Sequence, residues 1–151
     1  MVAAAGMIIF MALAALAAAD QELVLGLDFT DSASPGAWNC LHGYDFVSVF
    51  KRGYSPYNGG TADASVVSDI TQAGRCKFIT EYCFRWTTVY ISPNATSSKT
   101  GIQQVEETLT MLKNNGVTVR ALWLQVTSPL DWPADQAANY QFISDALQRM
   151  R

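Results

Sequence analysis

The chain has 151 residues, of which 10 are Lys or Arg and 13 are Asp or Glu, giving a net charge of −3. This slightly acidic balance excludes a protein that binds nucleic acid by charge, because such a protein needs an excess of Lys and Arg to neutralise phosphates. The length from Asp20 to Arg151 suits one domain, but it is short of the roughly 200 residues or more of a complete eight-unit α/β barrel.

Residues 1–19 carry no charged side chain and are predicted to be a secretory signal peptide. The apolar run from Met7 to Ala17 is followed by two more alanines, which satisfies the small-residue rule for cleavage before Asp20. A membrane anchor is the lesser alternative, because a transmembrane helix needs about 20 apolar residues and usually has flanking Lys or Arg. We therefore expect a secreted protein, extracellular or lumenal, that contacts no membrane after cleavage and has a single domain at residues 20–151.

Export has consequences for the cysteines and for one asparagine. In an oxidising compartment the three cysteines predict one disulfide and one free thiol, with the pairing left open among Cys40, Cys76 and Cys83. Together with His42, which we expect at the surface, they match no usual zinc pattern, so no metal and no cofactor is expected. Asn94, in Asn-Ala-Thr after a proline, is predicted to be a glycosylation acceptor in an exposed loop.

The predicted elements alternate between strands and helices. In chain order they are a strand at 23–27, a helix between Ser34 and Gly43, a strand at 46–50, a helix at 62–73, a strand at 89–92, a helix from Thr100 to Asn114, a strand at 117–126 and a helix starting at Pro133. Four strand-then-helix units in series indicate an α/β fold with a parallel sheet and right-handed crossovers.

Three local patterns refine this prediction. Thr100 with Gln103 is typical of a capping box at a helix start. The last helix is expected to bury one face, formed by Ala137, Tyr140, Ile143, Leu147 and Met150. The segment Arg75 to Thr88 is too long for a helix-to-strand connection of about 2 to 6 residues. It is either a functional insertion, for which a loop closed by a Cys76–Cys83 disulfide is one option, or an altered form of a shorter junction.

Functional residues are expected just past the strands, because ligands of parallel α/β proteins lie at the carboxyl ends of the strands. Asp28 follows an apolar strand there, although capping of the next helix is an equal alternative. Tyr54, Tyr57 and Trp132 offer rings on which a sugar can stack, with simple packing as the alternative. Gln125, Thr127 and Asp131 follow the fourth strand.

Four segments resemble one known family. They are Gly26-Leu27-Asp28-Phe29, Arg52-Gly53-Tyr54-Ser55-Pro56, Val89-Tyr90-Ile91-Ser92-Pro93 and the run from Trp123 to Pro129 with Trp132. Their order and spacing resemble glycoside hydrolase family 25, in its invertebrate lysozyme-like branch. The resemblance implies a modified TIM-type barrel, here incomplete at its C-terminal end. It also implies cleavage of the β-1,4 bond between N-acetylmuramic acid and N-acetylglucosamine in peptidoglycan.

The resemblance also identifies a departure in the catalytic residues. Asp28 matches an aspartate of the family at the end of the first strand, whereas the family's Asp-x-Glu, with Glu as proton donor, is replaced by Gln125 and Thr127. Glycoside hydrolysis needs a carboxylic acid to protonate the leaving oxygen, and Asp131 is the nearby substitute. Two alternatives follow: a secreted muramidase of bacterial digestion or innate defence, or an impaired or incomplete lysozyme-like protein that binds carbohydrate through Gln125, Thr127 and the aromatic residues.

Overall fold

The computed structural model describes residues 25–41, 44, 46–74, 86–127 and 129–151. Its strands are β1 (Leu25–Phe29), β2 (Phe46–Ser55), β3 (Thr61–Ala62), β4 (Trp86–Ile91) and β5 (Ala121–Leu124). Its helices are α2 (Pro35–Leu41), α3 (Ser65–Ala73), α4 (Gly101–Asn114), the short 3-10 helix η2 (Pro129–Asp131) and α5 (Gln136–Met150).

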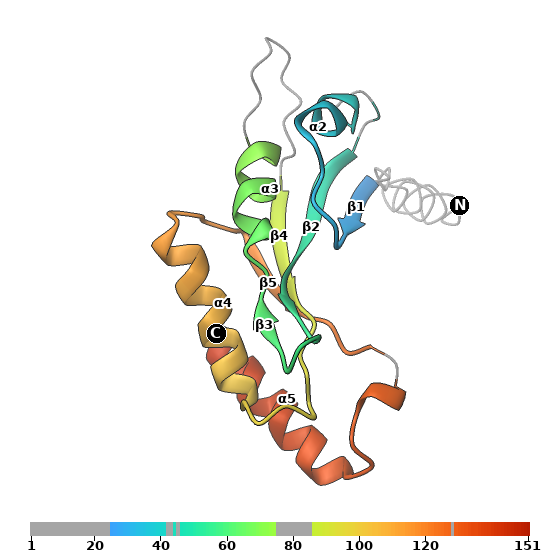
Figure 1. The fold of residues 1–151 in the computed structure, drawn as a ribbon, viewed down its shortest axis with the longest axis vertical. Coiled ribbons are helices and arrows are strands. Elements are labelled where there is room, and N and C mark those ends of the chain that lie inside the picture. Colours follow the sequence, from blue (N-terminus) through green and yellow to red (C-terminus); the bar gives the residue numbers. More distant parts are fainter. Residues whose placement is uncertain (1–24, 42–43, 45, 75–85, 128) are drawn as a thin grey trace, which may run out of the picture.

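The strands form one sheet in the order β1-β2-β4-β5, and these four strands are parallel. The two-residue strand β3 pairs antiparallel with the end of β2. The carboxyl ends of the parallel strands therefore point toward the same end of the molecule, near η2 (Figure 1). The predicted α/β fold with alternating parallel strands and helices is confirmed, and it is compatible with part of a TIM-type barrel.

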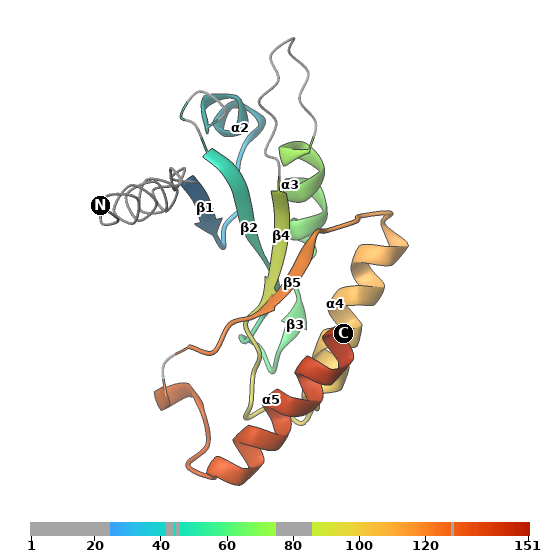
Figure 2. The same ribbon diagram turned by 180° about the vertical axis from the view of Figure 1, so that it is seen from behind.

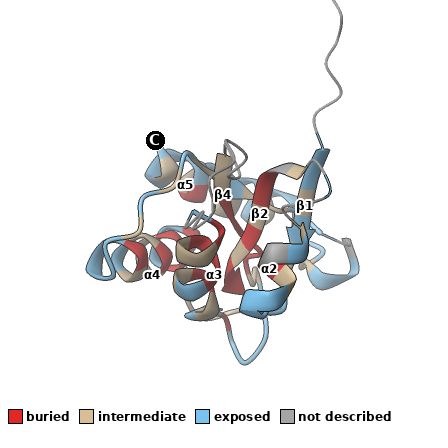
Figure 3. Ribbon diagram, turned by 90° about the horizontal axis from the view of Figure 1, so that it is seen from above, coloured by how far each residue is buried: buried red, intermediate tan, exposed pale blue. Residues whose placement is uncertain are grey.

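Helices α2, α3 and α4 lie on one face of the sheet, as the two opposite views show, and α5 packs against α4 near β5 (Figures 1 and 2). In β2, Val49 and Lys51 point to this face and are fully buried, whereas the intervening Phe50 and Arg52 belong to the other face and are half-buried. One apolar cluster joins Val49 to α2 and α3, and a second joins Ile91 to α4 and α5. Coloured by burial, β2 contains buried residues, whereas the edge strand β1 is largely exposed (Figure 3).

Helix α4 begins as the sequence predicts. The Thr100 hydroxyl accepts a hydrogen bond from the Gln103 amide at 3.2 Å, and the Gln103 side chain accepts one from the Thr100 amide at 2.8 Å. This reciprocal capping satisfies two backbone donors that the first turn leaves without helical partners. The predicted capping box is confirmed.

The predicted apolar face of the last helix is wrong in part: Ile143 and Met150 are half-buried, and Met150 packs against the second apolar cluster, but the other three residues are exposed. Tyr140 is 74% exposed and Leu147 is 43% exposed, whereas the buried residue of α5 is Ala146. The reason is a close approach of α5 to the start of α4, where a β-carbon added to Gly101 would lie 2.6 Å from the Phe142 carbonyl oxygen. Small residues allow this approach, so Gly101 and Ala146 set which side of α5 faces α4.

Several boundaries also differ from the prediction. Strand β2 continues to Ser55 instead of ending at Phe50, because its last residues pair with both β3 and β4. Strand β4 begins at Trp86, so the last three residues of the predicted insertion are sheet. Strand β5 is limited to four residues, and α5 starts after Asp135, whose side chain accepts a hydrogen bond from Ala138.

Some sequence predictions fall outside the described residues. These are the signal peptide at 1–19, His42, Cys76, Cys83 and the insertion over residues 75–85. Cys40 is exposed on α2. Because Cys76 and Cys83 lie outside the described residues, the predicted disulfide stays a prediction. In the described part of the chain, none of the helices is long and apolar enough to cross a membrane.

Candidate functional site

A cleft of about 700 Å³ lies at the carboxyl ends of β1, β2, β4 and β5. Its wall is mostly polar and includes carboxylate, guanidinium, hydroxyl and amide side chains. The lining residues are Asp28, Phe29, Thr30, Arg52, Pro56, Tyr57, Tyr90, Ser92, Pro93, Asn94, Thr96, Gln125, Thr127, Leu130 and Asp131. The position agrees with the rule that ligands of parallel sheets bind beyond the carboxyl ends of the strands.

Asp28 and Tyr90 are joined in this cleft. Asp28 is exposed near the end of β1, and the nearly buried Tyr90 hydroxyl hydrogen-bonds to its carboxylate from β4. Burial and the negative charge of Asp28 raise the pKa of Tyr90 to about 12. Tyr90 therefore stays protonated at neutral pH, and its O–H orients the carboxylate, whose remaining lone pairs can accept hydrogen bonds from sugar hydroxyls.

Arg52 contributes a second charged group beside Tyr90, its partner in the β2–β4 register. Its Nη2 lies 3.1 Å from Asp63 Oδ2 and its Nε lies 3.3 Å from the same oxygen. Burial raises the pKa of Asp63, but hydrogen bonds from Ser65 and Arg52 outweigh it, and the pKa lies below its usual value. The pair holds the guanidinium in place, since its two side chains are only 17% and 18% exposed.

The residues that follow β4 and β5 form the neutral side of the cleft. Ser92 Oγ donates to Gln125 Oε1 at 2.5 Å, and the Gln125 amide N–H donates to the Ile91 carbonyl at 2.8 Å. Among the described residues the Gln125 side-chain nitrogen donates no hydrogen bond, so it is available to a ligand carbonyl. Thr127 is exposed beside it and adds a hydroxyl.

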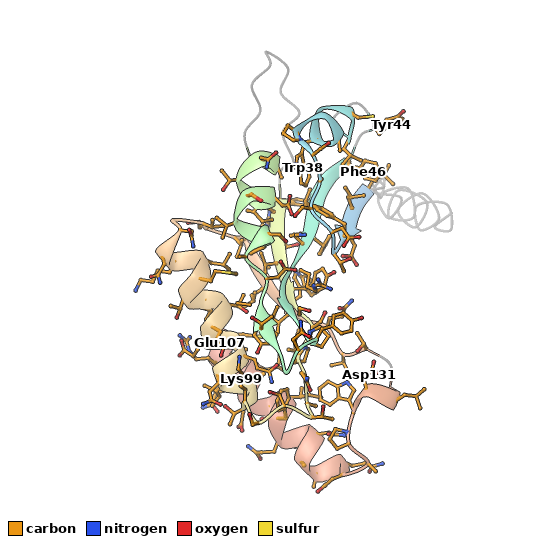
Figure 4. All side chains as sticks on the ribbon, in the orientation of Figure 1. Trp38, Tyr44, Phe46, Lys99, Glu107 and Asp131 are labelled. Atoms are coloured by element: carbon orange, nitrogen blue, oxygen red, sulfur yellow. The ribbon has the colours of Figure 1, made fainter. Side chains whose placement is uncertain are left out.

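Asp131 approaches the cleft from η2 and is exposed (Figure 4). The cleft thus contains two carboxylates, Asp28 and Asp131, on different elements. Paired carboxyl groups across a sugar are the requirement for acid–base glycoside hydrolysis. Gln125 and Thr127 cannot supply a proton, because an amide and a hydroxyl do not ionise near neutral pH.

The loop after β4 forms another wall and is held by a buried glutamine. Gln104 on α4 is fully buried; its Oε1 accepts from the Asn94 amide at 2.9 Å, and its Nε2 donates to the Asn94 carbonyl at 2.8 Å and to the Lys99 carbonyl at 3.2 Å. Lys99 also binds Glu107 at 2.9 Å and Gly60 O at 2.8 Å, and the labelled side chains point toward one another (Figure 4). The wall is therefore fixed before a ligand arrives.

Asn94, the predicted glycosylation acceptor, is half-buried in this wall. Its Nδ2 donates to the Pro56 carbonyl at 2.9 Å, and its Oδ1 accepts from the Thr96 amide at 2.9 Å and the Thr96 hydroxyl at 2.8 Å. In this arrangement the side chain joins the two loops that line the cleft.

The predicted aromatic residues separate into two groups. Tyr57 lines the cleft and is 70% exposed, so its ring can stack on a sugar. Tyr54 is fully buried in the second apolar cluster, and burial followed by the nearby Glu107 charge raises its pKa. Trp132 packs edge-on against Phe142 of α5 with ring centroids 5.8 Å apart, and neither it nor Tyr54 is part of the cleft lining.

Arg52 and Tyr90 line the cleft but were missed by the sequence analysis. Both lie inside strands, whereas the rule for parallel sheets points to residues just past the strands. The usable signal was the alternation along β2, which places Arg52 opposite the face of Lys51. Hydrophobicity does not reveal this alternation, because the buried residue is the charged Lys51 and the partly exposed neighbour is the apolar Phe50.

No cluster of three or more metal-binding side chains occurs in the described ranges of the chain. A family model described as Lysozyme-like protein 1 matches residues 19–151. The chain belongs to the lysozyme-like protein family. The cleft of this lysozyme-like chain is lined mainly by hydroxyl, amide and charged side chains.

Lysozyme-like proteins of Caenorhabditis elegans are among the relatives of this chain. Lysozyme-like protein 2 is 33% identical over 130 residues, which are 86% of this chain and 44% of the relative. Lysozyme-like protein 1 is 30% identical over 132 residues, or 87% and 42%. Lysozyme-like protein 7 is 34% identical over 112 residues, or 74% and 37%. The chain therefore spans less than half the length of these relatives, and no solved structure matches it.

Proposed function

We propose that this chain is a secreted lysozyme-like protein whose cleft binds a glycan strand of peptidoglycan, in bacterial digestion or innate defence. The observation that carries the proposal is the cleft at the strand ends, where Asp28, the Gln125 amide and the exposed Tyr57 ring line one space. Acceptor, donor and stacking surface are the three features that hold an N-acetylated sugar. The resemblance to glycoside hydrolase family 25 supports peptidoglycan as the polysaccharide.

Sedimentation of the chain with purified insoluble peptidoglycan tests this binding. Tyr57→Ala should weaken binding about fivefold to tenfold, because a stacking contact contributes about 1 to 1.5 kcal/mol. Tyr140→Ala is the matched control: Tyr140 is 74% exposed on α5, compared with 70% for Tyr57, and does not line the cleft. Absence of binding by the parent chain, or equal weakening by both substitutions, would exclude this cleft as the glycan site.

Hydrolysis of the β-1,4 bond is the second candidate, and one observation favours it. Asp131 reaches the same cleft as Asp28, so a second carboxyl group is present. By the resemblance, Gln125 and Thr127 stand where glycoside hydrolase family 25 has its acidic pair. Release of reducing sugar from peptidoglycan measures the reaction. Hydrolysis requires that both Asp28→Asn and Asp131→Asn abolish release, while Asp145→Asn on α5 leaves it unchanged. If the parent binds but releases no sugar, the chain binds glycan without cleaving it.

Secretion is proposed from the apolar segment at residues 1–19 and the three alanines before Asp20. Expression of the full chain in animal cells, followed by mass measurement of the protein in the medium, tests it. The expected product begins at Asp20. Retention of the uncleaved chain in the membrane fraction would favour the anchor alternative.

A further inference from the structure

Strand β1, which carries Asp28, is weakly held by apolar packing. It lies at the edge of the described sheet, where it pairs with β2, and its register shifts between Leu25 and Gly26. Leu25, Gly26 and Asp28 are exposed, and only Leu27 and Phe29 are half-buried. Tyr90 orients the Asp28 carboxylate, but the backbone that carries it also has to be fixed, because small displacements of a binding group weaken its hydrogen bonds steeply.

A fully buried ion pair supplies contacts to the segment that follows this carboxylate. Lys51 Nζ lies 3.0 Å from Asp69 Oδ2, and both side chains are 0% exposed. Lys51 Nζ also donates to the Thr30 carbonyl at 2.5 Å and lies 5.0 Å from the centre of the Phe29 ring. Asp69 Oδ1 accepts a hydrogen bond from the Ala33 amide at 3.3 Å. The pair thus holds the chain just after Asp28 at two separate backbone groups.

Stability alone does not account for a charged pair at this place. Removing both charges from water is costly, and well-packed apolar residues of similar volume often give equal or greater stability. Apolar side chains, however, cannot bind the Thr30 carbonyl and the Ala33 amide. The property specific to Lys51 and Asp69 is therefore the directed attachment of the β1–α2 connection to β2 and α3.

We propose that Lys51 and Asp69 are positioning residues of the cleft: they fix the end of β1 and the following residues 30–33, and thereby the Asp28 carboxylate. The inference deepens the proposed glycan binding and rests on it for the identity of the ligand. Its geometric part concerns the order of residues 25–34 and is measurable without any ligand.

The test is the double substitution Lys51→Met with Asp69→Leu, which replaces the pair by apolar side chains. A matched control removes another ion pair, Glu106→Gln with Arg149→Gln, which joins α4 to α5 and whose side chains are 46% and 41% exposed. Hydrogen exchange of residues 25–34, melting temperature and affinity for soluble peptidoglycan fragments are measured in all three proteins. Melting temperature separates positioning from a general loss of structure.

The double Lys51 and Asp69 variant should melt close to the parent. Exchange in residues 25–34 should accelerate at least about tenfold, and glycan affinity should fall about tenfold, as for one lost hydrogen bond. The control should change neither. Unchanged exchange in residues 25–34 overturns the inference. If exchange becomes faster in the double variant but the parent protein binds no glycan, the positioning role is supported and the proposed function is rejected.

If the double variant does not fold, hydrogen exchange in the parent protein still tests the positioning role. The Ala33 amide should exchange far more slowly than the amide of exposed Ser98, which has no hydrogen-bond partner among the described residues, because Ala33 donates to buried Asp69. Equal exchange of the two amides would show that the ion pair does not hold this segment.

Discussion

Substitution of Gln104 by leucine should loosen the cleft wall and destabilise the protein. Leucine has a similar volume, so little cavity forms, but three hydrogen bonds to Asn94 and Lys99 are lost. At about 1 kcal/mol for each bond, the free energy of unfolding should fall by about 3 kcal/mol. For a domain of this size that corresponds to roughly 10 °C in melting temperature.

Urea denaturation of the parent and two variants measures this change. Gln148→Leu is the control, because Gln148 is exposed on the same kind of element, helix α5, and should change stability by no more than about 0.5 kcal/mol. Glycan affinity should also fall in Gln104→Leu, since Asn94 lines the cleft. The two free energies of unfolding should differ by more than about 1 kcal/mol, the contribution of one hydrogen bond. A smaller difference between Gln104→Leu and Gln148→Leu would refute the argument that buried Gln104 holds the wall.

Three further predictions concern pH, helix packing and catalysis. Burial and the neighbouring carboxylate raise the pKa of Tyr90 to about 12. The resulting stabilisation is complete below about pH 10, where the unfolded phenol begins to ionise, and is lost as the pH rises to about 12. Tyr90→Phe should flatten this alkaline loss in urea denaturation. Gly101→Ala should cost about 1 to 3 kcal/mol, because its new β-carbon would lie 2.6 Å from a backbone oxygen of α5. Gly36→Ala is the control: its new β-carbon would have its nearest neighbour 3.9 Å away, so urea denaturation of this variant should show no loss of stability. Gln125→Asp with Thr127→Glu should raise the release of reducing sugar from peptidoglycan, since it adds carboxyl groups to the cleft. If this variant still binds peptidoglycan but releases no more reducing sugar than the parent, the missing acid is not what limits hydrolysis.

Local signals predicted the order of elements because each depends on neighbouring residues. The Thr100 and Gln103 pair starts α4, and Pro35 starts α2, as the sequence indicates. The buried face of α5 could not be predicted, because it depends on Gly101, more than 30 residues away in sequence. Contact through Ala146 overrides the apolar stripe that contains Tyr140.

The same distinction applies to the cleft. Asp28, Tyr57, Gln125, Thr127 and Asp131 line it because they follow strands or lie near strand ends, which the sequence pattern locates. Tyr54 differs because β2 extends through it and buries its ring, and strand length depends on pairing with β3 and β4. Arg52 and Tyr90 lie inside strands, so a rule based on strand ends does not find them. Whether such a side chain faces the cleft depends on how the strands assemble into the sheet.

The hydrogen bond between Ser92 and Gln125 shows that the shape of the cleft does not require an acid at position 125. Ser92 donates its proton to Gln125 Oε1, and a carboxylate oxygen at the same place would accept that hydrogen bond equally well. An amide can therefore occupy this position without disturbing the wall, whereas the capacity to give a proton to a leaving oxygen is lost. Under the proposed function, glycan binding and glycan hydrolysis therefore require different properties of the side chain at position 125. A chain with glutamine there is expected to bind glycan without protonating the leaving oxygen from this position.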